Sequence, residues 1–118
     1  MIDLTGLNGA TILVAPGSIY RLRPTTPSEG RDATRVDYLG GYVLTLEPAA
    51  ALLGRLTGEV RLIALTTRNG TPVWLNAAAI TRVREALPIN GPGSEIVVGG
   101  AYQHVVETVA AVQALLGA

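Results

Sequence analysis

The chain has 118 residues, a length that fits one domain. Nine basic residues balance nine acidic ones, and a formal net charge of +0 at pH 7 gives no general attraction to nucleic acid or to an anionic membrane. The absence of cysteine excludes disulfides, thiolate metal ligands and a cysteine nucleophile. No apolar run reaches the roughly 18 residues that a membrane-spanning helix needs. We therefore expect a cytoplasmic protein, or one that is part of an assembled particle.

The N-terminal half of the sequence predicts two β-hairpins, a strand between them and a helix. Asn8-Gly9 separates two apolar runs, and both residues suit the positive φ of a tight hairpin turn. Gly40-Gly41 marks a second turn of this kind. The expected elements are strands at Ile2–Leu7 and Thr11–Ala15, a helical turn at Pro16–Ile19, a strand at Tyr20–Pro24, strands at Thr34–Leu39 and Tyr42–Leu46, and a helix over about 48–56.

The second half of the sequence repeats the first. A shift of 61 residues (69 − 8 = 61) places Asn8-Gly9 on Asn69-Gly70. Further along, a shift of 60 residues (107 − 47 = 60) places Glu47 on Glu107. The change of one residue falls in segments that contain glycine and proline, where loops tolerate a change of length. The chain is therefore interpreted as a tandem duplication.

The repeat predicts an α+β, mainly β fold. Repeat 1 covers residues 1–58, and repeat 2 covers 59–118 with a helix over about 108–117 and Thr108 as its N-cap. A unit of about 60 residues buries too little of its surface to be more than marginally stable alone. We therefore expect two pseudo-twofold-related repeats, each with two hairpins, a connecting strand and a C-terminal helix. They would share one core and form one compact domain.

Paired arginines are the first candidate for partner contact. Arg21 and Arg23 recur as Arg82 and Arg84, and positions two apart on a strand project from the same face. A pseudo-twofold would bring four guanidinium groups into a related arrangement, suited to a phosphate, a carboxylate cluster or an acidic partner. The alternative is a solvated strand face on which the arginines pair with nearby carboxylates. The carboxylates available for this are Asp37, Glu85 and Glu95.

Trp74 and His104 are the remaining residues of interest. Trp74 lies where repeat 1 has Leu13, and either a contact anchor or a partly buried core position fits it. His104 is the only histidine, and its counterpart Leu44 favours a structural role. Neither a metal-ligand set nor a nucleophile–base triad can be assembled from this sequence. We therefore predict no catalytic, cofactor-binding or metal-binding residues and no enzymatic activity.

Both halves resemble the small FlbD-type proteins of flagellar and swarming motility. That family has a strand, Leu-Asn-Gly, an apolar strand, and Asn-Pro with an Ile two or three residues further on. A second hairpin at an Asn-Gly or Gly-Gly turn, a Val-x-Glu segment and a C-terminal helix follow. In repeat 1 these features are Asn8-Gly9, Pro16, Ile19, Gly40-Gly41, Glu47 and 48–56. In repeat 2 they are Asn69-Gly70, Asn76, Ile80, Gly99-Gly100, Glu107 and 109–116. The resemblance implies a β-rich unit that acts by contact and carries no catalytic residues.

Three functions remain open from the sequence. The resemblance favours a non-catalytic structural protein that binds one or more protein partners in a larger assembly such as a motility apparatus, and a homo-oligomer also fits. The candidate contact residues are Arg21, Arg23, Arg82, Arg84 and Trp74. The first alternative is a virus-particle protein that serves as decoration, cement or head–tail connector. The second is a small β-barrel-like nucleic-acid binder that uses the arginine pairs, which zero net charge and the lack of lysine disfavour.

Overall fold

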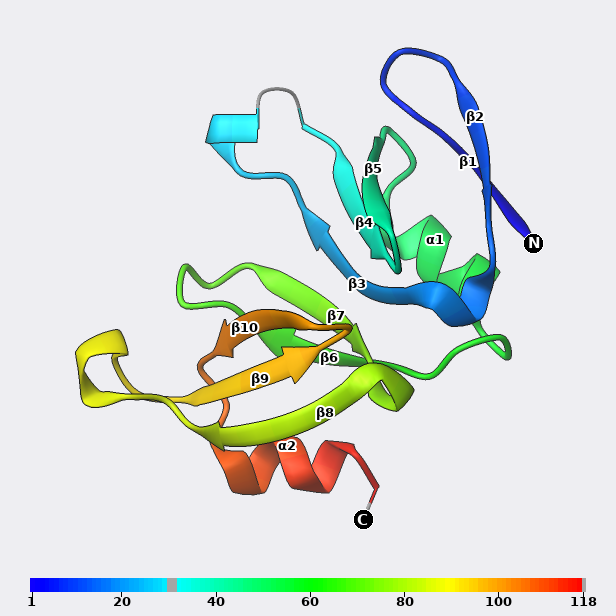
Figure 1. Cartoon of the computed structure of the whole chain (residues 1–118). Coiled ribbons are helices and arrows are strands. Elements are labelled where there is room, and N and C mark those ends of the chain that lie inside the picture. The colour runs from blue at the N-terminus through cyan, green and yellow to red at the C-terminus, as the bar shows by residue number, and fades with distance from the viewer. Residues whose placement is uncertain (30–31, 118) are drawn as a thin grey trace.

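The elements of the chain follow one another in the same order in its two halves (Figure 1). The computed structural model describes residues 1–29 and 32–117. The first half contains β1 (Ile2–Thr5), β2 (Thr11–Val14), β3 (Ile19–Pro24), β4 (Thr34–Tyr38), β5 (Gly41–Thr45) and α1 (Ala49–Leu56). The second half contains β6 (Leu62–Thr66), β7 (Pro72–Asn76), β8 (Ile80–Glu85), β9 (Ser94–Val98), β10 (Ala101–Val105) and α2 (Val109–Leu115). Short 3₁₀ turns lie at Pro16–Ser18, Pro27–Glu29, Ala77–Ala79 and Pro88–Asn90.

The strands of the described residues form three antiparallel sheets, so the fold is mainly β, as the sequence predicts. The sheets are β1-β2, β10-β9-β8 and a five-stranded sheet in the order β5-β4-β3-β7-β6. The five-stranded sheet takes strands from both halves, because β7 pairs with β3 through Arg21 opposite Leu75 and Leu22 opposite Trp74. Neither described helix is long and apolar enough to cross a membrane.

Pairing within the halves recurs in detail. The β3–β4 register has an irregularity between Ile19 and Arg21, and the β8–β9 register has one between Ile80 and Arg82. A side-chain hydrogen bond recurs as well. The Thr34 hydroxyl donates to the Glu47 carbonyl at 2.9 Å, and the hydroxyl of Ser94 donates to the carbonyl of Glu107 at 2.7 Å. Each bond attaches the end of a hairpin to the segment that leads into the following helix.

The first hairpin is wider than the sequence predicts. β1 ends at Thr5, and the Gly6 amide donates to the Ala10 carbonyl at 2.8 Å to close the turn. Gly9 has φ +86°, whereas no described residue other than glycine has a positive φ. The expected positive φ at Asn8 is therefore wrong. Its side chain accepts a hydrogen bond from the Ala10 amide instead, which lets the turn close without strain at the asparagine.

In the part of the chain that the structure describes, the buried apolar side chains form two clusters, which corrects the expectation of one shared core. The first cluster consists of Ile2, Leu4, Val14, Ile19, Leu22, Val36, Val43, Leu52 and Leu56. The second consists of Ile63, Leu65, Val73, Leu75, Ile96, Val98, Val105 and Val112. The cause is that each half packs its first hairpin, its three following strands and its helix around its own interior. Leu62 and Trp74 of the second half pack against the first cluster, and Tyr20 packs against the second.

The two helices match their predicted positions closely. α1 follows Pro48 and buries Leu52 and Leu56, whose spacing places them on one face. Thr108 precedes α2, and its hydroxyl accepts a hydrogen bond from the Ala111 amide at 3.1 Å, which confirms it as the N-cap. Each helix lies against the three-stranded part of its own half, and α2 lies at the far side of the second half in Figure 1.

Candidate interaction surface

In the first half, the face of β3 and β4 opposite to the buried Leu22 and Val36 carries a set of linked ion pairs. The Arg21 Nε donates to one oxygen of Asp37 at 2.8 Å, and the Arg35 Nε donates to the other at 2.9 Å. The Asp37 side chain is only 2% exposed. A charge that is this deeply buried has to be paired, and the two guanidinium groups compensate it. The sequence names Asp37 as a partner for the arginines, and the structure confirms that pair.

Glu29 extends this set and was missed by sequence reasoning. Its carboxylate accepts two hydrogen bonds from Arg23, at 2.9 and 3.1 Å, and one from Arg35 at 3.2 Å. The Thr26 amide also donates to it at 2.7 Å. The Arg23 hydrogen bonds are the main cause that lowers the pKa of Glu29 from 4.5 to about 2. The Thr-x-x-Glu spacing of a capping box was the signal that could have found it.

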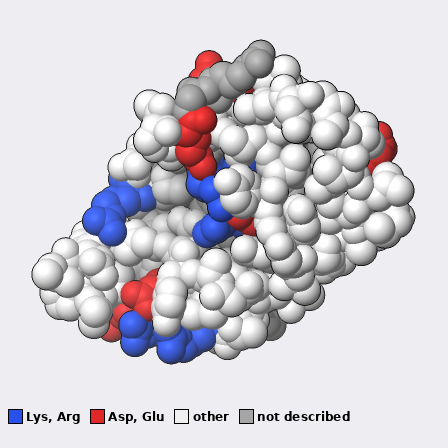
Figure 2. Space-filling model, turned by 45° about the horizontal axis from the view of Figure 1, so that its top comes forward, with Lys and Arg blue, Asp and Glu red and all other residues white. Residues whose placement is uncertain are grey.

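In the second half, the corresponding arginines are more exposed. The side chains of Arg82 and Arg84 are each 47% exposed and share the Glu95 carboxylate, at 3.6 and 2.7 Å. The Arg82 guanidinium lies 5.9 Å from the ring centre of Tyr102, which is 67% exposed. In Figure 2, basic and acidic side chains lie next to one another on a face that is otherwise largely uncharged. Of the other predicted partners, Glu95 is confirmed, and no ion pair of Glu85 is recorded among the described residues.

An exposed tyrosine beside an arginine also occurs in the first half. Tyr42 is 55% exposed, and the guanidinium of Arg35 lies over its ring at 3.9 Å from the centre. Tyr42 and Tyr102 hold matching positions on β5 and β10. Their arginine partners come from different strands, since Arg35 lies on β4 and Arg82 on β8. Each half therefore presents an aromatic ring and a cation together at its surface.

The four arginines singled out by the sequence bind three different carboxylates, which are Asp37 for Arg21, Glu29 for Arg23, and Glu95 for Arg82 and Arg84. Arg21 leaves its own half and donates from Nη1 to the Gln103 side-chain oxygen at 3.0 Å and to the Tyr102 carbonyl at 3.4 Å. Arg21 therefore helps to hold the halves together. Arg82 and Arg84 instead face Glu95. Tyr102 is contacted from both halves, because Arg21 donates to its carbonyl and Arg82 lies beside its ring, and the related arrangement of the four guanidinium groups stays a prediction.

Trp74 and Asn76 lie where the halves meet. Trp74 is partly buried against the first core cluster. Asn76 is 3% exposed, and its side chain donates to the Ile19 carbonyl at 2.9 Å while accepting from the Ala78 amide at 3.0 Å. Sequence reasoning placed Asn76 in the resemblance but assigned it no contact, because the strand that it bonds is distant in the chain.

His104 lies on the same outer face as Arg84 and opposite Glu95 in the strand register. Both of its ring nitrogens are buried without a hydrogen-bond partner in the described part of the chain. In residues 1–29 and 32–117, no three histidine, aspartate or glutamate side chains gather in a way that could hold a metal ion.

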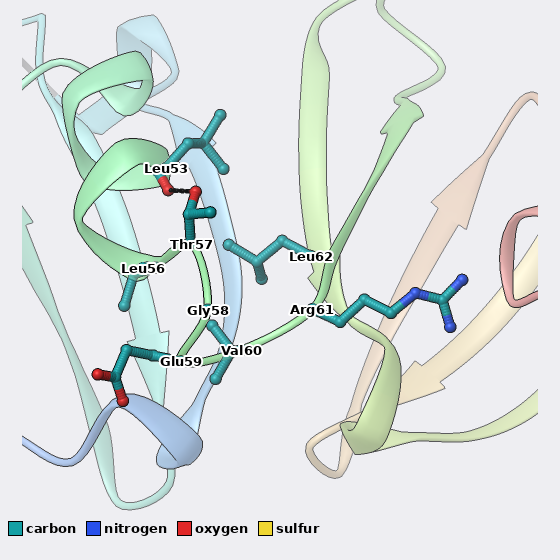
Figure 3. A pocket seen from close by; sticks show the side chains of 8 residues that line it. All are labelled: Leu53, Leu56, Thr57, Gly58, Glu59, Val60, Arg61 and Leu62. Atoms are coloured by element: carbon teal, nitrogen blue, oxygen red, sulfur yellow. Dashed lines mark hydrogen bonds between the residues drawn. The ribbon is translucent and has the colours of Figure 1, made fainter.

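A cleft of about 490 Å³ lies at the junction of the halves, between the end of α1 and the start of β6. Figure 3 shows Leu62 extending toward the end of α1, while Arg61 points away toward the second half. Arg61 donates to the carbonyls of Leu115 and Leu116 at the end of α2. The Thr57 hydroxyl donates to the Leu53 carbonyl at 2.8 Å. Two of the polar groups at this cleft are therefore committed to backbone contacts.

A search of protein-family models, of curated proteins and of solved structures found no match to this chain.

Proposed function

We propose that the chain is a non-catalytic structural or assembly protein that acts by protein–protein contact. The observation that carries this proposal is the surface formed by Tyr102, Arg82 and Arg84, which we name the Tyr102 face. Its tyrosine is 67% exposed and its arginines are each 47% exposed. Tyrosine and arginine are enriched among the residues that carry most of the energy of protein interfaces. A partner that desolvates this face would gain both the ring area and two charge-assisted hydrogen bonds.

The repeated architecture supports a tandem pair of FlbD-type units. The order of elements recurs, as do the strand irregularity before Arg21 and Arg82 and the hydroxyl contacts of Thr34 and Ser94. Under this proposal, one chain contains what two separate small units would otherwise assemble. The resemblance then favours a motility apparatus as the larger assembly.

The state of the carboxylates agrees with a contact protein. Asp37, Glu29 and Glu95 are each held by two arginines through hydrogen bonds or ion pairs. A general acid or base needs a proton that it can exchange near neutral pH. The low pKa of Glu29 keeps that carboxylate ionised, which suits a structural ion pair and not proton transfer.

Site-specific photocrosslinking in the source cells tests the proposal. A benzophenone amino acid at position 102 should give one or a few discrete protein adducts. The same group at Leu39, which is 63% exposed on a hairpin turn, is the matched control and should give a different and weaker pattern. Replacing Arg82 and Arg84 by serine should remove the position-102 adducts while the melting temperature stays within a few degrees, because both side chains are exposed.

Two results would overturn the proposal. One is identical crosslinking from positions 102 and 39, which would mean that the Tyr102 face has no specific partner. The other is micromolar binding of short RNA or DNA whose affinity falls steeply between two salt concentrations, which would indicate contacts with phosphates.

A further inference from the structure

The way in which the halves join leaves one strand edge free in each. β7 of the second half pairs with β3 of the first. In the order of elements, β2 of the first half corresponds to β7, and β8 of the second half corresponds to β3. In the described part of the chain, β2 pairs only with β1, and β8 pairs only with β9. Figure 1 shows the β1–β2 hairpin and β8 in different parts of the molecule, well separated in the view. A free edge exposes a row of backbone donors and acceptors that can pair with another strand.

The free edge of β8 borders an incompletely covered core. In the first half, Ile19 is 1% exposed and Leu22 is 0% exposed, because β7 and Trp74 cover β3. Their counterparts Ile80 and Val83 are only partly buried at the margin of the second core cluster. The side chains at these two positions are therefore fully buried in the first half and partly exposed in the second.

The free edge of β2 carries the complementary side chain. Leu13 holds the position of Trp74, yet its side chain is 63% exposed and lies on the face of β2 opposite to the buried Val14. Trp74 contacts the other half's core because β7 lies beside β3. Leu13 lacks such a contact only because no strand lies beside β2 on that side in the described part of the chain.

We propose that β2 of one copy pairs antiparallel with β8 of a second copy, in the register of the β3–β7 junction. That register places Leu13 opposite Val83 and Val14 opposite Arg82. Leu13 then covers the open margin of the second core cluster, as Trp74 covers the first. The occupant is a second copy because the chain itself shows these two strand positions pairing. This association goes beyond the proposed function, since it names a second copy and a strand register. It uses the backbone edge of β8, whose Arg82 and Arg84 also belong to the Tyr102 face, so the second copy would lie directly beside that face.

Each copy has both edges, so two copies can exchange them reciprocally. A reciprocal exchange forms a twofold dimer in which neither edge remains free for further growth. The association combines backbone hydrogen bonds along the edges with burial of apolar side chains, the combination that governs strand addition in general.

Disulfide trapping tests the register directly, because the natural chain has no cysteine. Directly opposed residues of an antiparallel pair have Cα atoms about 4.5–5.5 Å apart, within the range that a disulfide spans. Mixing the Leu13→Cys protein with the Val83→Cys protein should give a covalent dimer under mild oxidation. Mixing Leu39→Cys with Val83→Cys is the control, and its yield should be at least about tenfold lower, since position 39 is equally exposed but lies elsewhere.

Two outcomes of the trapping experiment would overturn the proposal. One is an equal yield from both mixtures. The other is a double variant, Leu13→Cys with Val83→Cys, that crosslinks within single chains at every concentration while the mixed single variants do not. That result would mean that the two edges close within one copy.

Sedimentation velocity over a wide range of concentrations measures the same association without crosslinks. The natural chain should form a dimer reversibly. Leu13→Lys should raise the dimer dissociation constant at least about tenfold, because it places a charge against apolar side chains. Leu39→Lys is the matched control and should change it less than about twofold. A natural chain that stays monomeric throughout, or equal effects of both variants, would contradict the proposal.

A gain of affinity provides the last check. Asn76 crosses the β7–β3 junction through its hydrogen bond to Ile19, and Ala15 holds the equivalent position beside β2. Ala15→Asn should place an amide donor near the Ile80 carbonyl of the second copy. We expect the dimer dissociation constant to fall about threefold or more. An unchanged or larger constant would contradict the proposed register.

Discussion

Two corresponding strands of the halves differ in their place in the sheets, because β3 is a central strand and β8 lies at an edge. β3 is covered on one side by β4 and on the other by β7, whereas β8 pairs with β9 alone in the described residues. The side chains of Arg21 and Arg23 are accordingly 12% and 20% exposed, while those of Arg82 and Arg84 are 47% exposed. An arginine pair repeated in the sequence is therefore part of the structure in one half and surface in the other. What lies beside a strand decides which role its side chains take.

The largest expected difference between the halves concerns Gly93, whose counterpart in the first half is Ala33. Gly93 has φ +119°, and a Cβ atom there would lie 2.0 Å from the Val105 carbonyl oxygen. We expect Gly93→Ala to lower the free energy of unfolding by about 4 kcal/mol or more, because backbone must move. Chemical denaturation measures this. Gly100→Ala is the control, since φ there is +84° but nothing lies within 4 Å, and it should cost only about 1 kcal/mol. Equal losses would mean that the close contact at Gly93 is relieved without cost.

Burial of the central strand gives the next largest effect. Leu22→Ala removes a side chain that is 0% exposed, and we expect a loss of about 3 kcal/mol in the free energy of unfolding. Val83→Ala in the second half should cost about 1 kcal/mol, because Val83 is only partly buried. Both values are measured by denaturation at low protein concentration, where the proposed dimer is dissociated. Equal losses would show that β8 is covered as completely as β3.

Local chemistry explains which parts of the structure were predictable. The helices, the Thr108 cap and the order of the hairpins follow from turn residues and short-range periodicity, and these were predicted closely, although the first turn is wider than expected. The pairing of Arg21 with Asp37 follows from strands that are neighbours in the chain. The β3–β7 junction joins segments more than fifty residues apart, and no short-range pattern encodes it. The prediction of one shared core was wrong for a different reason, because each half packs its buried apolar side chains around its own interior.

The same limit applies to the candidate surface. A repeat shift places Arg82 on Arg21, but it does not say which of them is covered by another strand. Exposure of the Tyr102 face depends on β8 lying at an edge. The ion pair between Glu29 and Arg23 could have been predicted, because the two residues are close in the sequence and Glu29 has the spacing of a capping box.

Asn76 is the next residue that separates the halves, because the first half has Ala15 in its place. Asn76→Ala leaves the buried Ile19 carbonyl without its side-chain donor and removes the cap of the following turn. We expect a loss of about 2 kcal/mol in the free energy of unfolding. Asn76→Asp is the matched variant, because it can still accept from the Ala78 amide but cannot donate to Ile19. It should be at least as destabilising as alanine, and a stability equal to that of the natural chain would contradict this role for the amide donor.

The smallest effect concerns pH and the ion pairs of the first half. The pKa of Glu29 is lowered from 4.5 to about 2, so its ionised form is favoured by folding. Its contribution is therefore complete above about pH 4.5 and is lost as the pH falls toward 2. We expect Glu29→Gln to cost about 1 kcal/mol at pH 7, a modest value because the carboxylate is 18% exposed and partly screened by solvent.

Measuring the free energy of unfolding from pH 7 to pH 2 separates this ion pair from other acid-sensitive contacts. The difference between the natural chain and Glu29→Gln should shrink steadily below pH 4.5 and approach zero near pH 2. Arg23→Gln should show the same convergence, because it removes the main cause of the lowered pKa. Combining the two changes should cost little more than either one, since both break the same pair. A difference that stays constant over this pH range would mean that Glu29 stabilises the first half through packing and not through its charge.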